Sequence, residues 1–471
     1  MKEMAIQKNE LQKGLKTRHI TMISIGGVIG SGLYVGTGTI INDTGPAAIL
    51  SYLLATIMVV LVMRMLGEMA VLNPDSGSFS TYAHQAIGPW AGYTIGWLYW
   101  FNWIIIIVIE ATILGAMVHQ WVPSIPMWTA SLSFPIIMMF TNIFSVKSYG
   151  EFEYWLAFIK VATIVSFLCV GTAMLLGIMP GVESPGMDNI NSYGGFFPQG
   201  ILPVFLSIVF ITFSLSGSEV AAIAAGESEN PEKNIMKAIN SVVWRLLIFF
   251  VGSSIILVFL LPKSEAGLFK APYASIFDMA GLPAAGQFMN IVIFVSLLSI
   301  LNTGMYTSSR ILYSLSKKGD APKLFSKVNK RGAPIGAILA CVVAAYMFTL
   351  LKFVAADQLF VILASSSGGV TMIMYIFIAI SHLRSRKKIE KENPGLLKVK
   401  MWLFPHLTYL TIFMLFTIFV AQAFIPSMRL QFFLTFCITG LVLVSYFVFI
   451  KNKKKKLNIV QTVSKKIIEE K

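Results

Sequence analysis

The stretch Gly26-Gly27-Val28-Ile29-Gly30-Ser31-Gly32-Leu33-Tyr34-Val35-Gly36 lies in the middle of an apolar segment, residues 20–42, that is long enough to cross a membrane. Glycine destabilises a helix interior by roughly 1 kcal/mol relative to alanine, and this stretch holds five glycines in eleven residues. The sequence therefore predicts a membrane helix that is interrupted at mid-span. Close helix packing is the alternative, because Gly26/Gly30 and Gly32/Gly36 are small-xxx-small pairs.

The composition indicates a polytopic membrane protein with an all-α fold. Hydrophobic residues make up 56% of the 471 residues and charged residues 13%, too few to cover a water-soluble fold. Mean hydropathy is +0.74. About twelve apolar stretches of membrane-spanning length follow one another, at 20–42, 46–71, 90–118, 127–144, 153–179, 201–225, 236–261, 287–315, 336–354, 358–381, 402–425 and 429–450.

A second interruption is predicted in the sixth span, at Ile211-Thr212-Phe213-Ser214-Leu215-Ser216-Gly217-Ser218-Glu219-Val220-Ala221-Ala222. Serine and glycine compete with helical backbone bonding, so this stretch favours an unwound segment. N–H groups freed at the first interruption suit a substrate carboxylate, and carbonyl groups freed at the second suit an ammonium group. Two interrupted helices, one early in each half of the chain, are typical of inverted-repeat transporters.

The candidate substrate-binding residues lie mainly in these two stretches. Polar residues of the eighth and tenth spans add two candidates, although small polar residues also serve plain helix packing. The predicted set is Ile29, Gly30, Ser31, Gly32, Phe213, Ser214, Leu215, Ser216, Gly217, Asn302 and Ser365.

Three ionisable residues, Glu110, Lys160 and Glu219, are predicted inside membrane helices. Such residues usually face the bundle interior or a water-filled path, so we assign all three to proton coupling. Glu110 and Glu219 are alternatively buried acids that stabilise the backbone, and Lys160 is alternatively a side chain that reaches back to the surface. We favour an inward Lys160, a fixed or titratable positive charge.

The second span ends in Arg64-Met65-Leu66-Gly67-Glu68, which places opposite charges four residues apart. Side chains at this spacing lie on the same face of a helix. We predict a structural Arg64–Glu68 ion pair near the cytoplasmic surface, with a cytoplasmic gate as the alternative.

Lysine and arginine are distributed unevenly over the predicted loops. Most of the 37 gather before Ile20, at 317–335, at 383–401 and from Lys451 onward, whereas the opposite loops hold few. Because cytoplasmic loops collect positive charge, both termini are expected in the cytoplasm. Topology thus explains the net charge of +15, and no nucleic acid partner is expected.

This topology divides the chain into a cytoplasmic segment at 1–19, a transmembrane transporter domain at 20–450 and a basic cytoplasmic tail at 451–471. The lysines at the start of the tail also suit contact with anionic lipid.

The sequence carries no motif of an enzyme or of a nucleotide-driven pump. The three cysteines lie one per apolar span, the histidines form no H-E-x-x-H, and no G-x-x-x-x-G-K-[ST] loop occurs. We expect no catalytic residue, no metal site and no cofactor, so a gradient must supply the energy for transport. A channel or a sensor on this fold is the alternative, but no segment shows the rings of like residues that line a pore.

From Leu15 to about Lys451 the sequence resembles the amino acid–polyamine–organocation superfamily, amino acid transporter branch. Within that branch it is most similar to bacterial gamma-aminobutyrate (GABA) permeases. The stretches that carry the wider resemblance are Gly27-Val28-Ile29-Gly30-Ser31-Gly32-Leu33, Arg64-Met65-Leu66-Gly67-Glu68-Met69, Ser145-Val146-Lys147-Ser148-Tyr149-Gly150-Glu151-Phe152-Glu153, and Ala224-Ala225-Gly226-Glu227 with Asn230-Pro231. The closer likeness lies in Trp121-Val122-Pro123, Tyr306-Thr307-Ser308-Ser309-Arg310 and Lys400-Met401-Trp402-Leu403-Phe404-Pro405.

The resemblance implies the fold of the sodium-coupled leucine transporter. In that fold two inverted five-helix repeats, here 20–179 and 201–382, are followed by two added helices, here 402–450. Alternating access around the broken helices 1 and 6 is the mechanism that this fold implies.

The resemblance also implies coupling to protons. Lys160 matches a fifth-helix lysine that stands where sodium-coupled relatives hold an ion. Phe213 matches the aromatic residue that closes over substrate, and Glu219 matches the glutamate after the second break. The sequence departs from the GABA permease pattern at Leu215, Ser216 and Ser218, where phenylalanine, methionine and threonine are usual.

We therefore expect a proton-coupled importer of the bacterial cytoplasmic membrane for GABA or a related small zwitterionic amino acid. Permeases of the same family for proline, alanine, histidine or an aromatic amino acid are the alternatives. The expected partners are the amino acid, the proton and the lipid bilayer, and the oligomeric state is left open.

Overall fold

The computed structural model describes residues 16–75, 77–144, 146–182, 184, 186–220, 223, 230–261, 263, 272–351, 359–426 and 428–451. Most of the predicted N-terminal segment, the basic tail after Lys451 and the matched stretch 224–227 lie outside these residues.

Every regular element in the described part of the chain is a helix. A π-helical segment, Leu247–Gly252, joins α13 to α14, and another, Tyr446–Ile450, follows α20. The α-helices are α2 (Thr17–Gly26), α3 (Ser31–Tyr34), α4 (Gly36–Thr44), α5 (Ala48–Leu72), α6 (Ser78–Ala86), α7 (Pro89–Trp121), α8 (Met127–Phe144), α9 (Val146–Leu175), α10 (Asp188–Ser192), α11 (Leu202–Ser214), α13 (Pro231–Leu246), α14 (Ser253–Leu260), α15 (Pro272–Met279), α16 (Pro283–Lys317), α17 (Ile335–Leu351), α18 (Leu359–Glu392), α19 (His406–Ala421) and α20 (Arg429–Ser445).

Nine helices among the described residues are long and apolar enough to cross a membrane. One of them, Ser31–Leu72, contains the end of the first predicted span and all of the second. Two shorter apolar helices, Leu202–Ser214 and Ile335–Leu350, match the sixth and ninth spans. Each predicted span therefore contains a helix, and the all-helical membrane architecture is confirmed.

Several helices extend beyond the predicted spans, α9 and α18 by the most residues. Helix α9 begins at Val146, within a polar stretch, and α18 continues past residue 381 to Glu392. The predicted bounds were placed where the run of apolar residues ends. A helix can continue beyond that point, because its backbone hydrogen bonds form with polar residues too and charged side chains one turn apart can pair. In α18, for example, Arg386 and Glu390 pair at 2.8 Å across one turn.

The predicted Arg64–Glu68 ion pair is wrong. The Glu68 carboxylate accepts hydrogen bonds from Arg386 Nη1 and from the Met401 backbone N–H, each at 2.7 Å, and His382 Nε2 lies 3.3 Å away. Helical spacing reveals local partners only, and here α18 and the chain before α19 supply the ligands of the buried carboxylate. Glu68 thereby connects three segments that are far apart in sequence.

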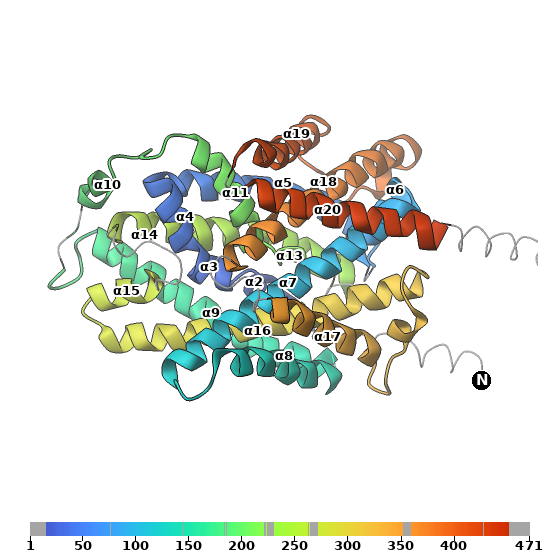
Figure 1. Cartoon of the computed structure of the whole chain (residues 1–471). Helices are drawn as coiled ribbons and strands as arrows, with labels where there is room; N and C mark the ends of the chain where they lie inside the picture. Colours follow the sequence, from blue (N-terminus) through green and yellow to red (C-terminus); the bar gives the residue numbers. More distant parts are fainter. Residues whose placement is uncertain are drawn as a thin grey trace, which may run out of the picture.

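Helix α7 runs through the centre of the bundle (Figure 1). It contacts α16, α8, α6 and α18, and most of its residues are buried. A helix that is apolar on all sides faces either other helices or lipid, and the burial of α7 shows that other helices surround most of it. Side chains that α7 directs at its neighbours are therefore held in fixed positions.

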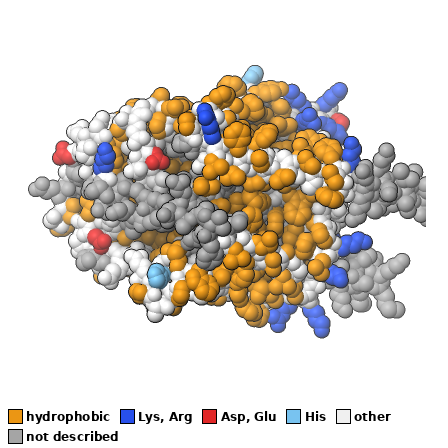
Figure 2. Space-filling view, in the orientation of Figure 1, with side chains coloured by type: hydrophobic (Ala, Val, Ile, Leu, Met, Phe, Trp, Pro, Cys, Tyr) orange, Lys and Arg blue, Asp and Glu red, His pale blue; other side chains and the backbone are white. Residues whose placement is uncertain are grey.

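The outer surface has an apolar flank and a basic end. Figure 2 shows hydrophobic side chains over most of the flank, with Lys and Arg gathered at one end. Large apolar residues such as Trp155, Phe413 and Phe436 are more than half exposed, as expected of side chains that face lipid tails. Helix α20 ends at the basic end, at the right of Figure 1.

Candidate functional site

Both predicted helix interruptions are confirmed. Helix α2 ends at Gly26 and helical structure resumes at Ser31. Helix α11 ends at Ser214, a turn covers 215–219, and Val220 is helical again.

The two interruptions touch each other through their backbones. Gly217 has φ 103°, a conformation that favours glycine, and a Cβ atom there would overlap the carbonyl of Gly27. The Ser214 hydroxyl donates to the Gly32 carbonyl at 3.1 Å. A Cβ atom on Gly32 would lie 2.7 Å from that hydroxyl oxygen. These positions need glycine because backbone lies against backbone.

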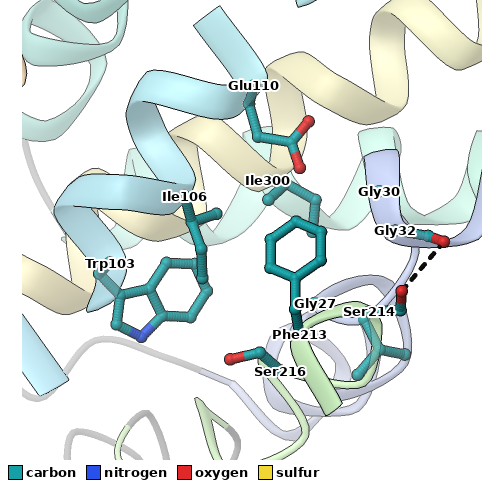
Figure 3. Close-up of a pocket in the computed structure, with 11 residues that line it drawn as sticks. Gly27, Gly30, Gly32, Trp103, Ile106, Glu110, Phe213, Ser214, Ser216 and Ile300 are labelled. Atoms are coloured by element: carbon teal, nitrogen blue, oxygen red, sulfur yellow. Dashed lines mark hydrogen bonds between the residues drawn. The ribbon is translucent and has the colours of Figure 1, made fainter. Parts of the chain in front are cut away.

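A small cavity of about 20 Å³ lies between the interruptions, α7 and α16. This volume holds roughly one water molecule. Figure 3 shows the Phe213 ring in the middle of the cavity residues, with Glu110 at one side and Trp103 at another. The lining residues are Gly27, Val28, Gly30, Gly32, Trp103, Ile106, Glu110, Phe213, Ser214, Ser216 and Ile300.

Glu110 of α7 is bound to Ser31 at the start of α3. Its Oε1 accepts the Ser31 hydroxyl at 2.7 Å and the Ser31 backbone N–H at 3.3 Å. Its Oε2 is buried and has no hydrogen-bond partner among the residues that the structure describes. A carboxylate of the protein itself therefore lies against a backbone N–H that the sequence analysis assigned to a substrate carboxylate.

Lys160 of α9 points inward and is fully buried. Its Nζ donates to the carbonyl of Gly26 at 2.6 Å and to Ser299 Oγ at 2.7 Å. Gly26 is the last residue of α2, where the negative end of the helix dipole favours a cation. The ammonium group thus binds one side of the first interruption, and Glu110 binds the other.

Glu153, to which the sequence analysis gave no role, is the acidic neighbour of Lys160. Its Oε1 lies 3.8 Å from Lys160 Nζ, and both side chains are fully buried. The carboxylate accepts the Ser299 hydroxyl and, at 3.4 Å, the Asn302 amide. Ser299 therefore accepts from Lys160 and donates to Glu153, so the hydrogen bonds run in one direction between the two charges.

Glu219 lies apart from the central cavity. The Gly217 backbone N–H lies 3.2 Å from both of its carboxylate oxygens, so the side chain is bound to its own turn. It lines a separate space of about 10 Å³ with Met63, Leu66, Ile235 and other residues of α5 and α13.

Several predicted binding residues do not line the central cavity. Asn302 accepts hydrogen bonds from Thr141 at 2.8 Å and Asn142 at 2.9 Å, within the network around Glu153. Ser365 is buried in α18. The other predicted residues that do not line the cavity are Ile29, Ser31, Leu215 and Gly217, all within the two interruptions.

Helix α18 reaches the site through a different serine. Ser367 donates to Asn102 Oδ1 at 2.5 Å, and the Asn102 amide donates to Ser216 Oγ at 3.4 Å. Ser367 of the tenth span is thus connected to the cavity residue Ser216 through Asn102.

Outside the two interruptions, sequence reasoning missed three apolar side chains of the cavity wall, Trp103, Ile106 and Ile300; within the first interruption it missed Gly27 and Val28. A signal was present for two of them, because Trp103, Ile106 and Glu110 are spaced i, i+3 and i+7 on one face of α7. If the face of α7 that carries Glu110 is assigned to the bundle interior, Trp103 and Ile106 are predicted to line the same cavity. Ile300 lies on α16, and no local pattern links it to the interruptions.

The described residues contain no group of three or more His, Cys, Asp or Glu side chains that could hold a metal ion.

Comparisons with known proteins identify the family. The amino acid permease family model matches residues 19–459. The gamma-aminobutyric acid permease of Bacillus subtilis is 52% identical, with 94% of each chain covered. That of Escherichia coli is 44% identical over 90% of this chain and 91% of its own. The aromatic amino acid transport protein AroP of Corynebacterium glutamicum is 38% identical over 88% and 89%.

A solved structure supports the fold. The chain matches the Eremococcus coleocola manganese transporter with a TM-score of 0.55 and 11% identity, over 92% of both chains. This likeness concerns the fold alone, and it confirms the predicted leucine-transporter-like class. Since the family model covers nearly the whole sequence, the chain belongs to the amino acid permease family and is an integral membrane transporter, not an enzyme.

Proposed function

We propose that this permease imports GABA, or a similarly small zwitterionic amino acid, together with protons across the bacterial cytoplasmic membrane. The relatives at 52% and 44% identity are named GABA permeases, whereas the one at 38% is named for aromatic amino acids. One observation carries the coupling proposal. The two sides of the interrupted first helix are bound by buried ionisable side chains, Gly26 by Lys160 and Ser31 by Glu110.

In this proposal the substrate carboxylate binds the N–H groups of Ser31 and Gly32. The ammonium group binds carbonyl oxygens of the second interruption, 214–217, and Phe213 closes over the substrate. Because the cavity of about 20 Å³ is far smaller than an amino acid, side chains must move apart to admit one. GABA separates its charges by three carbons, so the opened site must be elongated.

Glu110 is proposed to couple substrate binding to the proton. An ionised Glu110 accepts the hydrogen bonds of the Ser31 hydroxyl and N–H. It would repel a substrate carboxylate at the same N–H, because two negative charges close together in a buried site repel each other strongly. Uptake of a proton by Glu110 removes that repulsion and frees the Ser31 N–H for the substrate. Substrate and proton would therefore bind together.

Lys160, Glu153 and Glu219 are proposed to complete the proton path. Lys160 donates a hydrogen bond to the carbonyl of Gly26, the last residue of α2, and Glu153 lies beside its ammonium group. Loss or gain of a proton by either side chain would therefore alter the hydrogen bond between Lys160 and Gly26. Glu219 binds the second interruption through Gly217 and is the corresponding acid there.

The arrangement in the membrane is also proposed. Both termini lie in the cytoplasm, the inverted repeats occupy 20–179 and 201–382, and the added helices occupy 402–450. The gathering of Lys and Arg at one end of the molecule supports this orientation, because cytoplasmic surfaces of membrane proteins collect positive charge (Figure 2).

Transport by purified protein in liposomes tests the proposal. Radiolabelled GABA should accumulate under an inward proton gradient, and sodium should have no effect. A competition panel of neutral, acidic, basic and aromatic amino acids identifies the preferred substrate. Uptake of an α-amino acid without uptake of GABA would refute the substrate, and sodium-stimulated uptake without a proton gradient would refute the coupling.

A further inference from the structure

A larger cavity lies on the outer surface between α5, α13 and the chain that precedes α19. Its volume is about 270 Å³. None of its lining residues belongs to the central cavity. It is lined by Val60, Arg64, Ile239, Asn240, Val243, Trp244 and Trp402, and we call it the α5–α13 groove.

The groove opens toward the surroundings of the protein. Trp244 is 66% exposed and Trp402 46% exposed. Tryptophan is enriched where a membrane protein meets the boundary between lipid tails and water. The two indole rings therefore mark this groove as a surface at the level of the lipid headgroups.

Arg64 is fixed within the groove by contacts to two other segments. Its Nη1 donates to Asn240 Oδ1 at 3.0 Å and its Nε to the Lys400 carbonyl at 3.2 Å. The guanidinium carbon lies 5.1 Å from the centre of the Trp402 ring. These hydrogen bonds use two of the five N–H groups of the guanidinium, which leaves donors for an anion.

The charge of the groove changes along α13. Lys233, Lys237, Asn240 and Trp244 are spaced i, i+4, i+7 and i+11, so they follow one face of the helix. All four are exposed. Lysine lies at the outer end of this face and tryptophan at the inner end.

The chain before α19 adds a further basic residue. Lys400, whose carbonyl binds Arg64, is exposed. Lys398 is paired with Glu232 at 2.7 Å, so we do not count it among the ligands. The groove thus combines the Arg64 guanidinium with an apolar floor of Val60, Ile239 and Val243, and the exposed Lys237 and Lys400 belong to the segments that border it.

We propose that the α5–α13 groove binds one anionic glycerophospholipid. The phosphate binds Arg64, with Lys237 and Lys400 on the bordering segments, and an acyl chain lies along Val60, Val243 and Trp244. Each basic side chain near a membrane surface strengthens the attraction for anionic lipid. A zwitterionic lipid lacks the net negative charge that would complement Arg64 and the two lysines. A free phosphate has no acyl chain to cover the apolar floor. The site is independent of the transported substrate.

Native mass spectrometry of the purified full chain with added lipid tests the proposal. Phosphatidylglycerol should remain bound in preference to phosphatidylcholine of the same chain length, and should raise the unfolding temperature more. Arg64→Gln should lower this preference roughly fivefold, because one basic side chain near the membrane surface contributes about 1 kcal/mol. The double variant Lys237→Gln/Lys400→Gln removes two charges and should lower it roughly fivefold for each of them. The double variant keeps the contacts of Arg64, so its result does not depend on how Arg64→Gln folds.

Lys323→Gln, an exposed lysine outside the groove, is the matched control and should behave as the wild type. Equal retention of both lipids, or an unchanged preference in the double variant, overturns the proposal. Soluble glycerol phosphate is the third probe. If it stabilises the protein as much as phosphatidylglycerol does, the groove binds phosphate and not a lipid.

Discussion

The Glu110 carboxylate accepts two hydrogen bonds from one residue, Ser31, through its hydroxyl at 2.7 Å and its backbone N–H at 3.3 Å. This contact joins the central helix α7 to the start of α3. The Ser31 N–H therefore binds both the proposed proton carrier, Glu110, and, in our proposal, the substrate carboxylate. The substrate carboxylate can bind this N–H only when Glu110 releases it.

Glu110→Gln should uncouple binding from the proton. The amide keeps the size of the side chain and an acceptor for Ser31, but it neither carries a charge nor takes up a proton. GABA counterflow should persist, whereas accumulation driven by a proton gradient should fall by about tenfold or more, and the pH dependence of GABA binding should flatten. Accumulation at the wild-type level would remove Glu110 from the coupling mechanism.

Gly32→Val should abolish substrate binding. The new side chain would overlap Ser214, whose Oγ would lie 2.7 Å from its Cβ, and would push the two interruptions apart. Ser31→Ala keeps the backbone N–H and should be mild by comparison.

Gly440→Val is the matched control for Gly32→Val. A Cβ atom on Gly440 meets nothing within 4 Å. Both proteins are checked for folding by size-exclusion chromatography before GABA binding is measured. Normal binding by a folded Gly32→Val protein would argue against a site at the interruptions.

Lys160→Ala should abolish accumulation of substrate. It removes the ammonium group from the Gly26 carbonyl and from Ser299. Substrate counterflow, which needs no net proton movement, should survive if the lysine serves the cycle without touching substrate. Gradient-driven uptake by Lys160→Ala at the wild-type rate would contradict the coupling role.

Glu153→Gln should impair accumulation although the residue does not line the cavity. Removing the buried carboxylate leaves Lys160 without its acidic neighbour at 3.8 Å, a strongly unfavourable change for a buried charge. We expect a shift in the pH profile of uptake, with partial recovery in Glu153→Asp. Glu151→Gln, two residues away but partly exposed and bound to Arg18, is the control and should leave the profile unchanged.

Arg386→Met should destabilise the protein without changing its substrate. The Glu68–Arg386 pair is buried at 2.7 Å, and removing one partner of such a pair costs about 3–5 kcal/mol. Arg384→Met, an exposed neighbour on α18, should cost little. Thermal unfolding of both variants in detergent provides the comparison; equal unfolding temperatures would show that the buried pair contributes no net stability.

Local composition was sufficient to predict the main features of the fold. Glycine and serine in otherwise apolar stretches predicted both interruptions, because their effect on a helix is exerted within a few residues. The same reasoning failed for Glu68. Its partners Arg386 and Met401 are more than 300 positions away in sequence, and Arg64 at i−4 was the nearer but wrong candidate.

The site could be predicted only in part for the same reason. Glycine-rich segments identified the half of the cavity that is made of backbone. Ile300 and the pairing of Glu153 with Lys160 depend on how α9 and α16 pack, which no local spacing encodes. Asn302 was predicted as a polar substrate-binding residue of the eighth span, but sequence gave no means to tell that it binds Glu153 rather than lining the cavity.

The contact of Gly27 with Gly217 and of Gly32 with Ser214 limits how this permease can be redesigned. At these glycines a Cβ atom would overlap the backbone of the other interruption, so exchange of Gly32 or Gly217 disturbs the closure itself. On the other side of the cavity stand the side chains of Trp103, Ile106 and Ile300, carried by continuous helices. A protein engineer who wishes to change the size of the accepted amino acid should begin with these three, because they can be exchanged while the transport machinery stays in place.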